Sequence, residues 1–338
     1  MQQLIQLIPD RRCFAFLLRV LRGQAQVDFL SSALAGLVFT VALCAAGWQY
    51  GIYGLCGTAL GTATAQALGV ARDRVTAGLE GFNSCLVAVG FAAFLGAGHL
   101  STALLAAGGC IVVTVLTGAV GTLLRPWNLP TLTLPYCVTA SAMTIAAPGF
   151  VRVWHQGPGL ATLTRPASGP TALTWPDLWH AFFSNIAQIF FMPQWYVGAL
   201  FLLGIFIADR RLGALACLGS VVGIAAAWLL GAPAGQIADG GMGYNAVLVT
   251  MALGGVFLAT DGWSLAYAVT GATAATILTS ATAALFAPSG GHTFTWPFVL
   301  TTLAFLVAVP AFPRLRKAGE PTASEIPTGP ATPPAAAA

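Results

Sequence analysis

The stretch LPTLTLPY, Leu129 to Tyr136, places two prolines five residues apart in one of the most apolar regions of the chain. Proline lacks a backbone N–H and its ring clashes with the preceding helical turn, so two this close usually end a helix. Thr131 and Thr133 lie between the prolines and put hydroxyls where hydrocarbon would surround an ordinary span. The stretch therefore predicts a broken, polar segment inside a hydrophobic protein.

The composition of the chain places it in a membrane. Of its 338 residues, 57% are hydrophobic and 7% are charged, with a mean hydropathy of +0.81, whereas soluble domains carry about 25% charged residues. The basic residues are few and scattered along loops, which does not suggest nucleic-acid binding. We expect an all-α integral membrane protein that crosses the lipid bilayer several times and has no nucleic-acid partner.

Two sets of five apolar stretches approach the length of about 20 residues that a spanning helix needs. They lie at 28–47, 50–70, 82–97, 99–121 and 131–147, and at 188–208, 212–231, 243–260, 262–286 and 294–311. A segment rich in proline and glycine separates them, and the last twenty or so residues have the composition of a disordered tail. We predict a first repeat at 1–148, a connecting loop at 149–171, a second repeat at 172–312 and a disordered tail at 313–338.

The two sets are copies of one another at a spacing of 162 residues. Glycines such as Gly36 and Gly198 coincide at this spacing, and so do rarer polar and aromatic residues. The other matches used below are Gln26 with Gln188, Phe29 with Phe191, Phe82 with Tyr244, Asn83 with Asn245, Leu86 with Leu248, and Thr133 with Thr295. Chance pairing of glycines does not explain the glutamine, asparagine and threonine matches.

The number of spans and the positions of the charges predict that the second copy is inverted. Five spans per copy is an odd number, so the copies run in opposite directions. If both termini are cytoplasmic, most basic residues lie inside, and only Arg152 and Arg165 in the central loop lie outside. An inverted repeat of this kind forms its binding site between the halves near the bilayer midplane.

The second copy carries its own broken stretch, GHTFTWPF, Gly291 to Phe298. Irregular backbone at membrane depth is tolerated only where it is buried in protein or lines a polar cavity. Free carbonyls, with the hydroxyls of Thr133 and Thr295, could form a ladder of acceptors for a neutral hydrogen-bond donor. The alternative is a pair of proline kinks whose threonines bond back to their own helices; the register of the two copies favours the pore.

Paired side chains around these stretches are the other candidate binding residues. Gln26 and Gln188 offer donors and an acceptor without charge, which suits a polar solute that must also leave. The alternative for either glutamine alone is an interfacial side chain facing headgroups. Aromatic and aliphatic residues at paired positions could form a flat slot for planar molecules, although such residues more often fill a core. These are Phe29, Phe82, Leu86, Phe191, Tyr244 and Leu248.

The sequence lacks the motifs of several other functional classes. The seven cysteines show no metal-ligand spacing and are expected to fill the core, so we predict no metal and no cofactor. No hydrolase constellation is evident, and we predict no enzyme. Asn83 and Asn245 lie outside any NPA motif, and we expect them to bond freed backbone groups.

The acidic residues Asp28, Glu80 and Asp261 have no acidic repeat partner, so we expect interfacial or packing roles for them rather than a proton relay.

Taken together, these motifs resemble those of the urea transporter family. LPTLTLPY matches that family's LPxxTxPF signature, GHTFTWPFVLTTL looks like its second copy, and EGFNSCLVAVG and GMGYNAVLVTMALGG resemble its paired segments. The resemblance covers about residues 10 to 311, and the combination of these motifs is specific to the family. It implies a bacterial member of the family with two inverted halves, each of five spanning helices plus a half-membrane pore helix, assembled as a homotrimer in the inner membrane.

The resemblance also implies roles for the candidate residues. Gln26 and Gln188 would lie at the inner and outer urea sites, and Thr133 and Thr295 would flank the narrow middle. Phe29, Phe82, Phe191 and Tyr244, with Leu86 and Leu248, would form the hydrophobic slots. Departures from the family pattern are Gly291-His292 in place of Leu-Pro, Tyr136 in place of Phe, and Gly241 in place of a larger apolar residue. They bear on the width and selectivity of the outer slot.

We therefore predict a channel-like passive conduit for urea. Urea is planar, with four N–H donors and one acceptor, which fits aromatic walls with acceptors along one edge. A hydrophobic slot offers no charge to replace the hydration shell of an ion. The alternatives are a facilitator of a related small neutral solute, such as a short amide or ammonia, and a proton-coupled transporter that uses Asp28 or Glu80.

Overall fold

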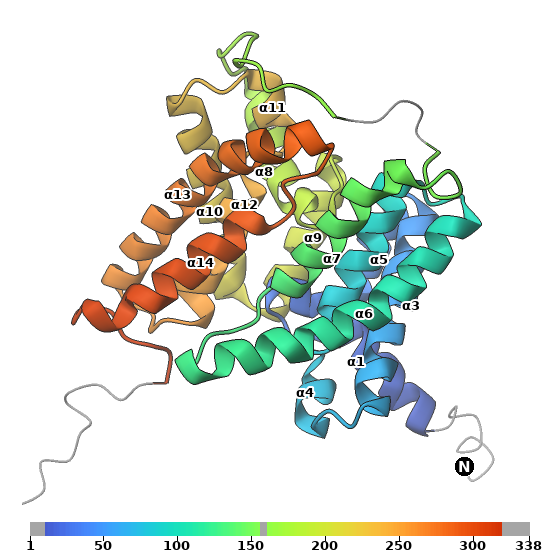
Figure 1. Cartoon of the computed structure of the whole chain (residues 1–338). Helices are drawn as coiled ribbons and strands as arrows, with labels where there is room; N and C mark the ends of the chain where they lie inside the picture. Colours follow the sequence, from blue (N-terminus) through green and yellow to red (C-terminus); the bar gives the residue numbers. More distant parts are fainter. Residues whose placement is uncertain (1–10, 156–160, 320–338) are drawn as a thin grey trace, which may run out of the picture.

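The computed structural model describes residues 11–155 and 161–319 (Figure 1). Within these ranges the chain is helical, apart from an isolated bridge between Leu258 and Lys317. The α-helices of the first half are α1 (Arg11–Ala25), α2 (Ala33–Ala46), α3 (Trp48–Ala67), α4 (Arg72–Ala77), α5 (Phe82–Leu95), α6 (Leu100–Leu124) and α7 (Leu134–Ala146). Those of the second half are α8 (Trp175–Ala187), α9 (Trp195–Ala208), α10 (Arg210–Leu229), α11 (Ala234–Ala238), α12 (Tyr244–Met251), α13 (Gly262–Phe286) and α14 (Trp296–Ala308).

The helix boundaries recur at the spacing found in the sequence. Helices α9, α10, α13 and α14 each begin and end 162 residues after α2, α3, α6 and α7. The short 3-10 turn at Gln26–Asp28 likewise recurs at Gln188–Phe190. The two copies therefore share local structure as well as sequence.

The predicted spans at 28–47 and 188–208 do not begin as continuous helices, which corrects the sequence analysis. Helix α1 ends at Ala25 and α2 resumes at Ala33 with a bend of 77° between the two segments, and the equivalent bend between α8 and α9 is 75°. Phe29 and Phe191 reverse the chain in left-handed backbone conformations, with φ of 63° and 65°. Apolar composition runs through both bends, so hydropathy alone did not reveal them.

Helix lengths divide the predicted spans into two groups. Among the described residues, three helical segments are long and apolar enough to cross a membrane: Leu100–Trp127, Arg210–Leu229 and Gly262–Ser289. The number is five if each bent pair counts as one span. Helices α5, α7 and α14 are shorter, with 13 or 14 residues each. Helix α12 has eight residues and continues as a π-helix, Ala252–Val256.

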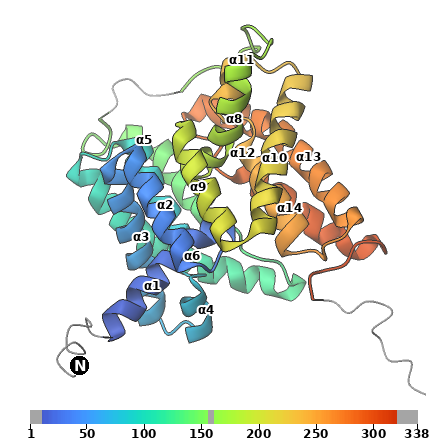
Figure 2. The same ribbon diagram turned by 180° about the vertical axis from the view of Figure 1, so that it is seen from behind.

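The two halves pack against each other through equivalent elements. The first half, blue to green, lies beside the second half, yellow to red, in both views (Figures 1 and 2). Helix α2 packs on α9, where the rings of Phe39 and Phe201 meet edge to face at 5.0 Å between centroids. These two phenylalanines are 162 residues apart. The halves therefore meet where each contributes the same residue.

The connecting loop and the start of the tail are attached to the second half. The backbone N–H of Thr162 donates to the carbonyl of Ala287, and that of Ala234 donates to Pro170. Ala259 and Ala318 donate to the carbonyls of Arg316 and Phe257 in the short bridge. Residues 156–160 of the predicted loop and 320–338 of the predicted tail lie outside the described residues.

Candidate functional site

The two broken stretches each end in a helix start at the centre of the molecule. Thr133 and Thr295 occupy the N-cap positions of α7 and α14, and Pro135 and Pro297 lie in the first turns of those helices. A proline there removes no helical hydrogen bond, because the first N–H groups of a helix have no partner within it. The prolines thus lie at the starts of two helices and do not kink a continuous helix. The residue before each threonine, Leu132 or Phe294, has a positive φ, of 48° and 44° respectively.

The two threonine hydroxyls meet between the halves. Thr133 Oγ1 lies 2.7 Å from Thr295 Oγ1, and both side chains are buried. The thiol of Cys137 lies 3.1 Å from the same Thr295 hydroxyl. The bond runs across the two copies rather than back into either helix, so the sequence-based alternative of back-bonded threonines does not describe this pair.

The paired asparagines hold the backbone around these helix starts, as expected. The amide of Asn83 donates to the carbonyl of Leu132 at 3.4 Å. The side-chain oxygen of Asn245 accepts the backbone N–H of Phe298 at 3.2 Å, and its amide donates to Thr279. Both asparagines are buried, and their bonds compensate backbone groups that the breaks leave without helical partners.

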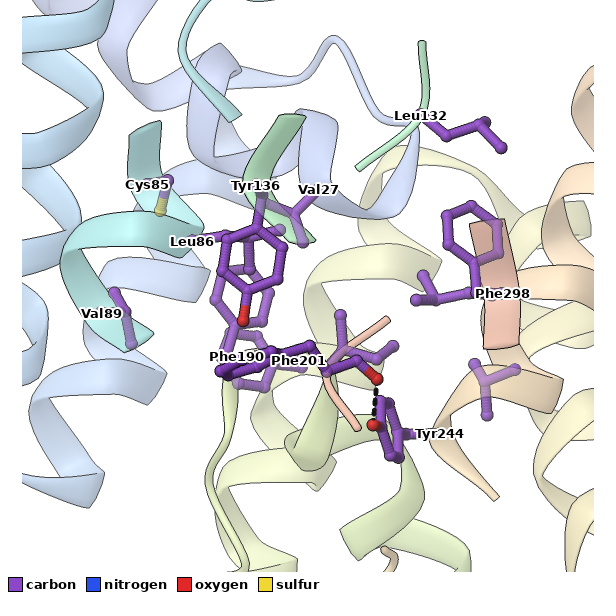
Figure 3. Close-up of a cluster of buried hydrophobic side chains, with 14 of the residues drawn as sticks. Val27, Cys85, Leu86, Val89, Leu132, Tyr136, Phe190, Phe201, Tyr244 and Phe298 are labelled. Carbon is purple, nitrogen blue, oxygen red and sulfur yellow. Dashed lines mark hydrogen bonds between the residues drawn. The ribbon is translucent and has the colours of Figure 1, made fainter. Parts of the chain in front are cut away.

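A cavity of about 580 Å³ reaches the threonine pair from the first half. Four of the sequence-predicted residues line it: Gln26, Phe29, Phe82 and Thr133. Leu86 does not; it is fully buried in the hydrophobic core (Figure 3). The cavity wall is mostly apolar, with the backbone of residues 129–133 along it.

The slot aromatics pair across the halves. Phe29 meets Phe298 of α14 edge to face at 6.1 Å, and Phe191 stacks on Tyr136 of α7 at 5.8 Å. Phe298 and Tyr136 are themselves repeat partners, so the two contacts are equivalent. Phe29 and Phe191 do not share a helical face with the glutamines three residues before them, because both phenylalanines end tight turns in the left-handed conformation.

The two glutamines occupy equivalent positions at the bends. Gln26 donates through Nε2 to the carbonyl of Ala77, and Gln188 donates to that of Asp239, both at 2.9 Å. Ala77 and Asp239 are also 162 residues apart. Both side chains are only partly buried. Each amide therefore fastens a bend to the short helix beside it and keeps further hydrogen-bonding capacity.

The second-half side of the site is packed with aromatic rings. Tyr244 donates its hydroxyl to the carbonyl of Phe294 (Figure 3), while Leu248 is buried in the core. The ring of Phe94 lies 4.2 Å from that of His292 and 5.7 Å from that of Phe191. Neither His292 nor Cys137 was among the predicted binding residues. For His292, the signal was the departure from Leu-Pro in the second signature.

The charged residues near the site include an ion pair and a buried carboxyl group. Arg74 and Glu80 line the cavity and form an ion pair at 2.7 Å. Asp28 is completely buried, and neither carboxylate oxygen accepts a hydrogen bond from the described residues. Of the two roles expected for Asp28, burial at the end of a helical segment fits packing inside the protein.

Comparison with known proteins shows the family to which this chain is related. The family profile described as urea transporter matches residues 17–310. The chain belongs to the urea transporter family. It is 31% identical over 306 residues to goat urea transporter 1, an alignment that covers 88% of this chain and 78% of the goat protein. It is 30% identical to the sheep and 29% identical to the rat urea transporter 1, with the same coverage.

Membership of the urea transporter family fixes the broad class of this protein. Members of the family are passive transporters, so the chain is a membrane transport protein and not an enzyme. The match extends over both copies of the signature and both bends. The broken stretches, the bends and the paired polar residues thus all fall within the region that the family shares.

Proposed function

We propose that this chain conducts urea passively through a narrow path between its two halves. The observation that carries the proposal is the hydroxyl pair of Thr133 and Thr295, which lies at the end of a cavity lined by Gln26, Phe29 and Phe82. Urea presents N–H groups around a flat face, and this path offers aromatic walls with backbone carbonyls and hydroxyls along it. The goat, sheep and rat relatives are named urea transporters, which supports the same solute.

The proposed path has three parts. Gln26, with Phe29 and Phe82, receives the solute on the first-half side, and Gln188, with Phe191 and Tyr244, releases it on the second-half side. Leu86 and Leu248 pack behind the aromatic walls. Between the slots, the hydroxyls of the two threonines exchange their mutual bond for bonds to the solute. An ion would lose its hydration shell without a charge to replace it, so the path excludes ions.

The membrane arrangement that we propose is an inverted repeat of two halves, at 1–148 and 172–312, with five spans and a half-membrane pore helix each. The recurrence of helix bounds supports it, as does the pairing of Phe39 with Phe201 between the halves. The distribution of basic residues supports cytoplasmic termini. A homotrimer in the inner membrane of a bacterium completes the proposal and follows from the family resemblance.

Stopped-flow light scattering with purified protein in liposomes tests the function. We expect urea to equilibrate much faster than in empty liposomes, with no ion current in planar bilayers. A competition series with formamide, acetamide and methylated ureas separates urea from related small solutes. Absence of urea flux above that of empty liposomes, from protein shown to be folded, would exclude urea as the solute.

A proton-coupled transporter is the second candidate, because Asp28 is a buried carboxyl group without a hydrogen-bond partner among the described residues. Intramembrane acidic groups often take part in proton relays. Proton coupling would let liposomes accumulate urea above the external concentration and would make this accumulation sensitive to an uncoupler. Simple equilibration is the result that we expect, and it would dismiss coupling.

Substitution of Cys137 should have a small effect on urea flux. Its thiol contacts the Thr295 hydroxyl, and valine stands at the equivalent position, Val299. Such weak sulfur hydrogen bonds contribute about 0.5–1 kcal/mol, so C137V should slow urea flux by about two- to fivefold. C137S replaces the thiol with a hydroxyl that can still bond Thr295, and it should stay near the wild-type rate. Equal slowing by both variants would show that the thiol fills space rather than orients Thr295.

A further inference from the structure

The first signature of this chain has a tyrosine, Tyr136, where its repeat partner is Phe298. The rings take equivalent positions, because Tyr136 stacks on Phe191 as Phe298 meets Phe29. The ring of Tyr136 also meets Phe294 edge to face at 5.5 Å. At this pair of rings, the two slots differ by one hydroxyl group, located on the second-half side.

The hydroxyl of Tyr136 is buried without a partner. The side chain has no exposed surface, and its oxygen makes no hydrogen bond to any residue that the structure describes. Figure 3 shows this hydroxyl at the end of the ring away from its own helix, whereas the Tyr244 hydroxyl carries a drawn bond. A buried polar group without a partner is destabilising, so its presence calls for an explanation.

The hydroxyl of Tyr136 lies close to the ring of Phe191. A methyl group built on Gly90 would lie 3.6 Å from the Tyr136 oxygen and 3.4 Å from the ring of Phe191. Gly90, Tyr136 and Phe191 therefore converge on one point. No side chain of residue 90 fills that point, which leaves the hydroxyl facing the wall that Phe191 provides.

Several donors around this slot are already engaged. Tyr244 gives its only hydroxyl proton to the carbonyl of Phe294, and the threonine hydroxyls bond each other. One N–H of Gln188 is bonded to the carbonyl of Asp239. Backbone carbonyls can accept the N–H groups of urea but offer nothing to its oxygen. Tyr136 supplies a buried O–H without a partner beside the ring of Phe191, which can donate to the oxygen of a carbonyl solute.

We propose that the Tyr136 hydroxyl donates a hydrogen bond to the carbonyl oxygen of urea in the second-half slot and thereby favours solutes that have such an oxygen. The inference rests on the proposed urea pathway and deepens it. It makes the two slots unequal: the slot of Phe29 and Phe298 holds the solute by its faces, whereas that of Phe191 and Tyr136 also binds its oxygen. Thiourea, whose sulfur accepts hydrogen bonds weakly, should benefit less from this hydroxyl.

The test compares wild type, Y136F and Y267F in liposomes by stopped flow over a range of urea concentrations, with thiourea as the second solute. Y136F removes one oxygen and copies the residue found at the equivalent position, Phe298. Y267F is the matched control, because the Tyr267 hydroxyl bonds the carbonyl of Phe305 away from the site. We expect the half-saturating urea concentration to rise about fivefold in Y136F, as for the loss of one neutral hydrogen bond.

The preference for urea over thiourea should fall in Y136F, by at most the same factor, and stay unchanged in Y267F. Equal changes for both solutes would mean that the hydroxyl only affects packing, and this would overturn the inference while leaving the urea pathway intact. An unchanged half-saturating concentration in Y136F would overturn it as well. Absence of urea flux in the wild type would instead overturn the proposed function itself.

Discussion

Valine at position 295 should slow urea flux more than any other single change in the pathway. The substitution keeps the volume of threonine but removes the hydroxyl that Thr133 and Cys137 both contact. The Thr133 hydroxyl is then left buried without its partner, and a solute loses one polar group between the two proposed slots. A buried group without a partner costs about 1–3 kcal/mol, which corresponds to about a 5- to 150-fold lower rate if it applies to the barrier.

The equivalent variant T133V should show a loss of similar size, and stopped-flow flux into liposomes measures both. The serine variants T133S and T295S are the controls, because they retain the hydroxyl and lose only a methyl group. We expect the serine variants to remain within about threefold of wild type, below the cost of one neutral hydrogen bond. Valine variants that conduct urea at the wild-type rate would contradict a role for the hydroxyls in permeation.

Alanine at Gly36 or Gly198 should destabilise the protein strongly. At both bends, two helices approach so closely that a methyl group has no room: it would lie 1.8 Å from the carbonyl oxygen of Leu21 at Gly36, and 1.9 Å from that of Phe183 at Gly198. The obstacle is backbone in both cases and cannot rotate away. Overpacking typically costs 1–3 kcal/mol and occasionally more, and we expect about 3 kcal/mol or more here.

Thermal unfolding in detergent, followed by intrinsic fluorescence, measures this loss. G108A is the matched control, because Gly108 lies within α6 and a methyl group there meets nothing within 4 Å. Alanine favours a helix over glycine by about 1 kcal/mol, so G108A should be neutral or slightly stabilising. G36A or G198A with a wild-type unfolding temperature would show that the bends are looser than the structure describes.

Much of the site could be predicted from the sequence because it occurs twice. The spacing of 162 residues singled out the glutamines, the threonines and Asn83 with Asn245, and the contacts of each pair prove to be equivalent or shared. Residues that only fill the core need not recur at this spacing, so recurrence helps to distinguish candidate site residues from them. The cavity then brought together four of the predicted residues, Gln26, Phe29, Phe82 and Thr133.

Some features depended on how the chain folds back on itself. The bends after α1 and α8 are as apolar as the helices, and only close packing at Gly36 and Gly198 and the left-handed turns reveal them. The choice between an interfacial and a packing role for Asp28 also depended on the bend, which places that end of the helical segment inside the protein.

The sequence by itself determined the class of protein, the duplication, and the residue types that a neutral planar solute needs, because composition and repetition are local properties of the chain. The tertiary structure decided which of these residues meet. It placed Thr133 against Thr295, paired Phe29 with Phe298 and Phe191 with Tyr136, and left the Tyr136 hydroxyl without a partner. Contacts between residues far apart in the chain depend on how two separately folded halves pack, and hydropathy carries no information about that packing.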